Sequence, residues 1–111
     1  MSYNIIPTTR FKKEAKRLVK KYPSLKKELA ELSENLSLRP KIGTSLGNNA
    51  YKIRLSVKSK GQGKSGGARV ITYLVTENLE VYLLTIYDKS ELDSIDDKTL
   101  RTIISSIKAG K

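Results

Sequence analysis

The sequence predicts an α+β fold in which an N-terminal helical hairpin packs on an antiparallel-type sheet, with the element order β-α-α-β-β-β-α. Apolar residues recur at helical spacing over about residues 9–37 and 97–108, whereas about residues 50–88 have the pattern of strands. The chain of 111 residues has the length of one domain, and its 38% apolar and 30% charged residues are typical of a globular protein. We therefore expect one domain over residues 1–111.

The N-terminal third has the pattern of a short strand and two amphipathic helices. Tyr3–Ile6 is apolar-rich and is stopped by Pro7, which is typical of an edge strand. Thr8 or Thr9 then caps a helix with one apolar and one basic face. Pro23 ends this helix, because the residue before a proline avoids the α conformation. A second helix follows, and its apolar stripe consists of Leu25, Leu29, Leu32 and Leu36.

The middle of the chain is predicted to be a loop followed by strands. Residues 38–50 are rich in Pro, Gly and Asn, so we expect a loop there. Apolar and polar residues then alternate, which places Lys52 and Arg54 on the face opposite to the apolar side chains. Arg69–Thr76 and Leu79–Tyr87 are predicted to be central strands covered on both faces. A last helix is expected to close at Gly110.

The chain contains neither histidine nor cysteine. The missing cysteines exclude a disulfide scaffold, a thiolate nucleophile and a Cys-x-x-Cys metal or redox site. The missing histidines exclude the commonest general base and the commonest ligand of transition metals. Chemistry at neutral pH must therefore use lysine, arginine, tyrosine, hydroxyl or carboxylate groups. We expect no metal site and no cofactor.

The positive charge is concentrated in one part of the chain. The sequence has 22 Lys and Arg against 11 Asp and Glu, for a formal net charge of +11. No carboxylate occurs between Glu34 and Glu77, although basic residues are frequent there. Interspersed charges would serve solubility, so this stretch indicates a surface that holds phosphates. Nucleic acid is the first candidate for a partner of such charge.

No segment has the pattern of a secretion signal or a membrane span. The first seven residues lack a basic start and an apolar run, and the longest apolar-rich segments are too short to cross a bilayer. We therefore expect a cytoplasmic protein without a membrane partner.

The glycine-rich segment Gly61–Gly67 does not match a nucleotide-binding phosphate loop. Lys58 stands where that motif needs its first glycine, and a strand follows the segment instead of a helix. A basic hairpin loop that wraps a polyanion fits the residues better.

A constellation of basic and phenolic residues is the strongest functional signal. If the strands are neighbours, Lys52, Arg54, Arg69 and Tyr73 converge on one patch. Tyr87-Asp88-Lys89 ends the last strand and projects toward the same region. The structural alternatives are a solvated outer face for Lys52 and a core position for Tyr87. The remaining tyrosines that we expect to be packing residues are Tyr3, Tyr22, Tyr51 and Tyr82.

Three motifs in order resemble the RelE/ParE toxin superfamily, and its HigB-like branch most closely. They are Tyr51-Lys-Ile-Arg-Leu, the segment Lys60–Ile71 and Val81-Tyr-Leu-Leu-Thr-Ile-Tyr-Asp-Lys-Ser-Glu-Leu. The resemblance implies a RelE-like fold and a bacterial toxin that cuts mRNA in the ribosomal A site. It also implies a cognate helix-turn-helix antitoxin, HigA-like, that holds the toxin inactive in a hetero-oligomer.

The resemblance also implies which residues act. The basic active-site positions fall on Lys52, Arg54 and Arg69, and Lys89 matches the lysine after the last strand. The chain departs from the family at Ser90, where many members have arginine, and around Asp93–Asp97, where acidic and small residues replace a C-terminal tyrosine.

A metal-free cleavage mechanism follows from these groups. We expect Arg54 and Arg69 to clamp the phosphoryl oxygens, and Lys52, Lys89 or Tyr87 to take part in proton transfer. The residues expected to contact RNA or the ribosome are Lys12, Lys13, Lys16, Lys20, Lys58, Lys60, Lys64 and Tyr73.

Two other functions stay open at this point. One is a ParE-like inhibitor of DNA gyrase, which blocks replication without cutting RNA. The other is a non-catalytic basic domain that binds nucleic acid.

Overall fold

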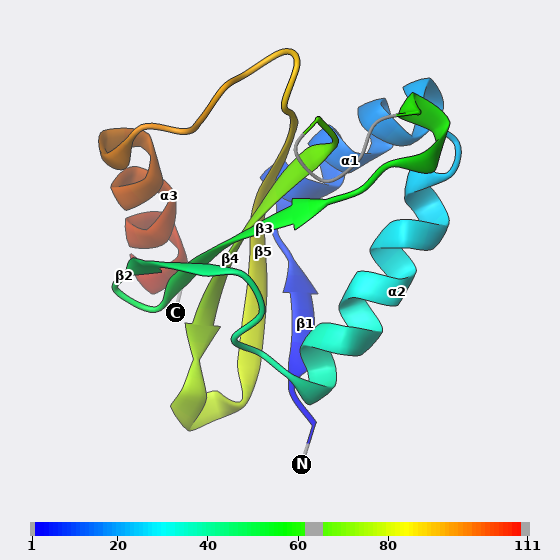
Figure 1. The fold of residues 1–111 in the computed structure, drawn as a ribbon. Helices are drawn as coiled ribbons and strands as arrows, with labels where there is room; N and C mark the ends of the chain where they lie inside the picture. The colour runs from blue at the N-terminus through cyan, green and yellow to red at the C-terminus, as the bar shows by residue number, and fades with distance from the viewer. Residues whose placement is uncertain (1, 62–65, 110–111) are drawn as a thin grey trace.

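Residues 2–61 and 66–109 are described by a computed structural model, which confirms the α+β fold (Figure 1). Five strands form one sheet in the order β1-β5-β4-β3-β2, in which β1 and β5 are parallel and all other neighbours antiparallel. The elements along the chain are β1 (Asn4–Pro7), α1 (Thr9–Lys21), α2 (Leu25–Leu38), β2 (Thr44–Gly47), β3 (Ala50–Leu55), β4 (Ala68–Val75), β5 (Glu80–Asp88) and α3 (Asp97–Ala109).

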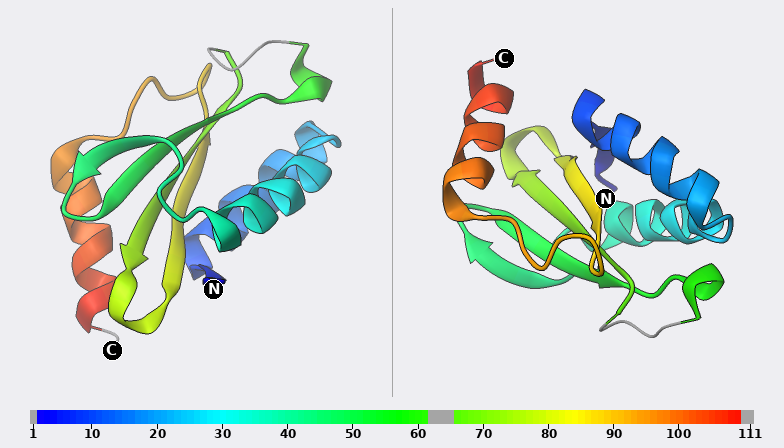
Figure 2. Two further views of the ribbon diagram at one scale, coloured as in Figure 1. Left: turned by 60° about the horizontal axis from the view of Figure 1, so that its bottom comes forward. Right: turned by 90° about the horizontal axis from the view of Figure 1, so that it is seen from above.

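The helices cover both faces of the sheet. Figure 2 shows α1 and α2 on one side of the strands and α3 on the other. The predicted helical hairpin therefore packs on one face, while the last helix covers part of the opposite face. The central strands β4 and β5 are buried along nearly their whole length, as their apolar composition predicted.

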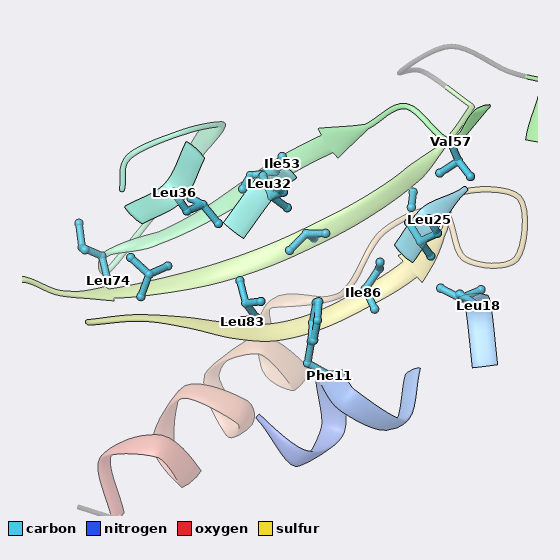
Figure 3. Packing of buried hydrophobic residues seen from close by; sticks show 13 residues of the cluster. Phe11, Leu18, Leu25, Leu32, Leu36, Ile53, Val57, Leu74, Leu83 and Ile86 are labelled. Carbon is cyan, nitrogen blue, oxygen red and sulfur yellow. The ribbon is translucent and has the colours of Figure 1, made fainter. Parts of the chain in front are cut away.

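The larger core lies between the helical hairpin and the sheet (Figure 3). Leucines at helical spacing along α2 reach the core because residues three and four apart share one face. Thr8 begins α1 by accepting a hydrogen bond from the Phe11 amide at 3.1 Å. The buried residues of this core include Phe11, Leu18, Leu25, Leu32, Leu36, Ile53, Val70, Leu83 and Ile86.

A second core lies between α3 and the opposite face of the sheet. Leu100, Ile103 and Ile104 of α3 pack there against apolar side chains of β4 and β5. The strand residues of this core include Ile71, Tyr73, Tyr82, Leu84 and Tyr87.

The prediction of a loop over residues 38–50 was wrong for β2. This strand forms a hairpin with β3, and its turn residues Asn48 and Asn49 have φ angles of 52° and 64°. Asparagine tolerates this left-handed conformation, which two-residue hairpins require. All four residues of β2 are exposed, so the strand lacks the apolar alternation by which the other strands were predicted.

The remaining differences are at the ends of elements. The first strand extends to Pro7 and lies at the sheet edge, as predicted, where a residue without an N–H group is tolerated. Gly110, expected to end the last helix, and Lys64 lie outside the described residues.

Candidate active site

Three neighbouring strands bring Arg54, Arg69 and Tyr87 into one row. Arg54 of β3 is the cross-strand partner of Arg69 on β4, and Arg69 is in turn the partner of Tyr87 on β5. Cross-strand partners share a face and have Cβ atoms about 5 Å apart. Lys52 lies two residues before Arg54 and therefore on the same face. This is the face that α3 covers at its other end.

A β-bulge puts Tyr87 into this row. β4 pairs Tyr73 with Tyr82 and Arg69 with Tyr87, because the register shifts by one residue between Ile71 and Thr72. Leu84 and Tyr87 consequently pack in the same core although they are three residues apart, a spacing that regular alternation would place on opposite faces.

Tyr73 lies at the other end of the same face and does not join the row. It is 7% exposed and packs in the core beneath α3, opposite Tyr82. The convergence predicted for Tyr73 with the basic residues was therefore wrong, and Tyr87 supplies the phenol. Even spacing correctly predicted the face of Tyr73, but three strand residues separate it from Arg69.

Arg69 and Tyr87 are buried, at 4% and 6% exposure, whereas Arg54 is exposed. The Arg69 guanidinium donates a hydrogen bond to the carbonyl of Ala68 at 3.2 Å. Burial raises the pKa of the Tyr87 phenol above its ordinary value, and the positive charge of Arg69 opposes this shift only partly. The backbone amide of Ile95 lies near the phenol oxygen. Within the described part of the chain, however, this oxygen forms no hydrogen bond that meets the usual geometry. Tyr87 is therefore protonated at neutral pH.

Lys89 follows β5 and adds another cation to this region. Its backbone amide donates to the carbonyl of Gly67 at 3.1 Å, and its ammonium forms an ion pair with the exposed carboxylate of Asp93. The hydrogen bond from Lys89 lowers the pKa of Asp93, with smaller contributions from the charges of Lys52 and Arg69. The carboxylate of Asp93 thus interacts favourably with the positive charges of Lys89, Lys52 and Arg69. We define the site cluster as Lys52, Arg54, Arg69, Tyr87 and Lys89.

A buried carboxylate, Asp88, anchors the end of β5 next to Lys89. Lys60 donates to it at 2.5 Å, Tyr22 at 2.7 Å and the Ser90 hydroxyl at 2.7 Å. Burial by itself raises the pKa of the Asp88 carboxyl, but these hydrogen bonds outweigh it and hold the pKa well below its ordinary value. Asp88 therefore stays ionised. The sequence offered one signal for it, an acidic residue at the end of an otherwise apolar strand.

Lys60 has a structural role, because its ammonium binds groups of the protein itself. Its side chain is 6% exposed, and its ammonium also donates to the carbonyl of Gly66 at 2.6 Å. Lys60 thus links the start of β4 to the end of β5, in contrast to the solvent-facing lysine expected of an RNA contact. Gly67, next to this contact, packs closely on the backbone at the end of β3, since a Cβ there would lie 2.1 Å from the carbonyl oxygen of Leu55.

The segment after β5 is also tied to α1. Glu91 accepts from Arg17 at 2.8 Å and from Lys21 at 3.3 Å, and the hydrogen bond from Arg17 contributes most to lowering the pKa of Glu91. These groups are largely exposed, so each pair adds little to stability. Their effect is to hold the turn that carries Lys89.

The other predicted RNA contacts lie away from the site cluster. Their side chains are exposed, and all but one belong to α1, on the opposite face of the sheet. These residues are Lys12, Lys13, Lys16, Lys20 and Lys58.

No group of three or more acidic residues within the described ranges could hold a metal ion. In the same part of the chain, no helix is long and apolar enough to cross a membrane.

The fold is similar to that of a solved bacterial toxin. No protein-family model matches the chain. The structure of the E. coli toxin RelE, as a double arginine-to-alanine mutant in the free state, superimposes with a TM-score of 0.61. The match covers 84% of this chain and 90% of the RelE chain, at 19% sequence identity. The fold is RelE-like. The fold that the resemblance implied is thereby confirmed, and the row formed by Arg54, Arg69 and Tyr87 lies on a RelE-like sheet.

Proposed function

We propose that this chain is the toxin of a type II toxin–antitoxin pair, an endoribonuclease that cleaves mRNA on the ribosome and so inhibits translation. The observation that carries the proposal is the cross-strand row of Arg54, Arg69 and Tyr87 on a RelE-like fold, flanked by Lys52 and Lys89. The three motifs favour the HigB-like branch within that superfamily.

The proposed reaction uses the RNA itself as nucleophile. The ribose 2′-oxygen attacks the adjacent phosphorus, the bond from phosphorus to the 5′-oxygen breaks, and a 2′,3′-cyclic phosphate and a 5′-hydroxyl end result. Negative charge builds on the phosphoryl oxygens in the transition state. Arg54 is exposed and can meet these oxygens with its guanidinium fork, and Arg69 supplies a second positive charge directly beside it.

Two protons must move in this reaction. Tyr87 is protonated at neutral pH and donates a proton to the leaving 5′-oxygen in this proposal, which requires RNA binding to expose its buried hydroxyl. Lys52 or Lys89 receives the proton of the 2′-hydroxyl in this proposal, which requires that lysine to be in its neutral amine form. The lowered pKa of Asp93 makes that carboxylate a weak base, although it lies beside Lys89.

The basic outer surface of α1 fits the proposed ribosome contact. Exposed lysines make phosphate contacts that do not depend on sequence. Such contacts would hold the toxin on ribosomal RNA while the site cluster meets mRNA.

We also propose a cognate helix-turn-helix antitoxin, HigA-like, as the partner. A chain with a net charge of +11 is complementary to an acidic segment that folds on binding. The partner is tested by co-expression with any small reading frame that lies next to the gene and encodes a helix-turn-helix protein. Growth is expected to be arrested by this chain alone and restored by the pair.

The nuclease activity is tested with purified ribosomes programmed with a short mRNA. We expect cleavage only of ribosome-bound mRNA, with a 2′,3′-cyclic phosphate and a 5′-hydroxyl at the break. A matched mRNA with 2′-deoxyribose at the scissile nucleotide is expected to resist cleavage, because it lacks the nucleophile. Cleavage of that deoxy substrate would contradict the mechanism.

The same experiment separates the other functions. Intact mRNA together with inhibited supercoiling by DNA gyrase would indicate a gyrase inhibitor. Intact mRNA with unaffected gyrase and retained RNA binding would indicate a non-catalytic binding domain.

A further inference from the structure

The β-bulge of β5 decides which side chain stands beside Arg69. The pairing of Tyr73 with Tyr82, continued without the extra residue, would place Ile86 opposite Arg69. Ile86 instead packs in the core beneath α1 and α2, while Tyr87 faces the opposite side. The composition of the site cluster therefore depends on this one irregularity.

Polar groups around the bulge form hydrogen bonds with Thr8, which caps α1, and with Glu14 of α1. β1 ends with Pro7 opposite Leu83, so the chain continues into α1 where a further strand partner would otherwise lie. The hydroxyl of Thr8 donates to the carbonyl of Leu83 at 3.0 Å and to that of Leu84 at 3.2 Å. One carboxylate oxygen of Glu14 accepts from the Thr85 hydroxyl at 2.7 Å and from the Ile86 amide at 3.1 Å.

Glu14 is the single acidic residue of the thirteen in α1. Its second carboxylate oxygen lies 3.4 Å from the Arg10 guanidinium. The two oxygens thus have separate partners, one on β5 and one on its own helix. Pairing with Arg10 involves only neighbouring positions on the helix surface. The two bonds to β5 instead go to Thr85 and Ile86, which directly follow the extra residue of the bulge, Leu84.

We propose that Glu14 is a positioning residue whose carboxylate holds the bulge of β5 in the register that sets Tyr87 beside Arg69. Without the Glu14 carboxylate, the Ile86 amide would have no acceptor, and the bulged geometry would lose the hydrogen bond that stabilises it. The consequence for mRNA cleavage rests on the proposed function, whereas the register itself does not.

The test compares Glu14→Ala with Glu14→Gln and Arg10→Ala. Glutamine keeps an oxygen that accepts both hydrogen bonds, and Arg10→Ala removes only the partner on the helix. Hydrogen exchange of the Ile86 amide and the cross-strand nuclear Overhauser effect between Arg69 and Tyr87 report the register without any activity measurement.

For Glu14→Ala we expect at least about 10-fold faster exchange at Ile86 and a weakened contact between Arg69 and Tyr87. The cleavage rate at saturating ribosomal complex is expected to fall about 10-fold or more, with unchanged affinity for that complex. Glu14→Gln and Arg10→Ala are expected to stay within about 2-fold of the original chain in all three measurements.

Unchanged exchange and an intact Arg69–Tyr87 contact in Glu14→Ala would overturn the proposal, as would a Gln variant that behaves like the Ala variant. A changed register with full cleavage would overturn the link to catalysis. If the original chain does not cleave mRNA, the proposed function fails, and exchange still decides the role of Glu14. If Glu14→Ala does not fold, Thr85→Val removes one donor to the same oxygen and is judged by the same two structural measurements.

Discussion

Arg54 of β3 and Arg69 of β4 are direct cross-strand partners, so two arginine side chains leave the sheet on the same face at neighbouring positions. Like charges in this arrangement repel and destabilise a sheet by about 0.2–1 kcal/mol. Arg54 is exposed, whereas Arg69 is buried and hydrogen-bonded to a backbone carbonyl. A phosphate bound at this face would relieve the repulsion.

Arg54→Ala is expected to separate activity from stability. Cleavage of ribosome-bound mRNA should fall about 100-fold, because the variant lacks one of the two charges to which the proposed mechanism assigns stabilisation of the transition state. The free energy of unfolding should stay unchanged or rise by up to about 1 kcal/mol, since the repulsion from Arg69 is removed. Denaturant unfolding and the cleavage assay measure both. The matched control is Arg39→Ala, an exposed arginine after α2, which should change neither quantity. A parallel loss of stability and activity in Arg54→Ala would argue against the clamp.

Tyr87→Phe is expected to lower cleavage about 100-fold if the phenol donates the proton to the leaving oxygen. The hydroxyl is buried and makes no hydrogen bond within the described residues, so its removal should leave the free energy of unfolding within about 1 kcal/mol of the original value. Tyr51→Phe, on the opposite face of the sheet, is the control and should retain full cleavage. Full cleavage by the Tyr87 variant would exclude the phenol as the acid.

Lys60→Ala and Lys58→Ala are expected to differ mainly in stability. Loss of Lys60 leaves the buried carboxylate of Asp88 with only the more distant ammonium of Lys21, at 3.9 Å, and should cost about 3 kcal/mol in unfolding free energy. The Lys58 side chain is exposed, so its loss should change that free energy by less than about 0.5 kcal/mol. Urea unfolding of the two variants measures the difference. If Lys60 serves only to contact RNA, its variant will instead lose cleavage at unchanged stability.

Asp88 should make the protein less stable in acid. Its pKa in the folded protein lies below the ordinary value of about 3.9 that it has when unfolded. The carboxylate therefore stabilises the fold above about pH 4, and this contribution is lost as the pH falls toward the lower folded pKa. Asp88→Asn should make the acid limb of the unfolding free energy shallower, by up to about 1.4 kcal/mol per pH unit. An unchanged acid limb in that variant would contradict the role of the buried carboxylate.

The lysines of α1 should govern the salt dependence of ribosome binding. Replacing Lys16 and Lys20 by alanine removes two exposed charges, so the slope of log K against log salt should fall by about 0.7–0.9 for each phosphate that is no longer neutralised. Filter binding at several salt concentrations measures the slope. The matched control replaces Lys98 and Lys108 of α3, which are also exposed, and should leave the slope unchanged. An equal fall of the slope in both double variants would contradict a specific role of α1.

Local patterns determined much of the fold. The period of the apolar residues predicted α1, α2 and α3, and the alternation around Lys52 and Arg54 placed both side chains on one sheet face. β2 was missed because an exposed, short strand has no buried face, and a buried face is what creates apolar alternation. The asparagine pair at its turn was the only local signal.

The order of the motifs, through the resemblance to a known superfamily, likewise predicted the RelE-like fold. The concentration of positive charge predicts a phosphate-binding surface, which stays a prediction. Only the tertiary structure decided that Tyr87 belongs to the site cluster and that Lys60 is a buried partner of Asp88. A one-residue bulge exchanges the faces of a strand, and this one brings Tyr87 beside Arg69. Lys60 is buried because its partner Asp88, 28 residues further along the chain, ends β5 beside it. Both outcomes depend on contacts between residues that are distant in the sequence and become neighbours only when the sheet has formed. Local periodicity carries no information about such long-range contacts.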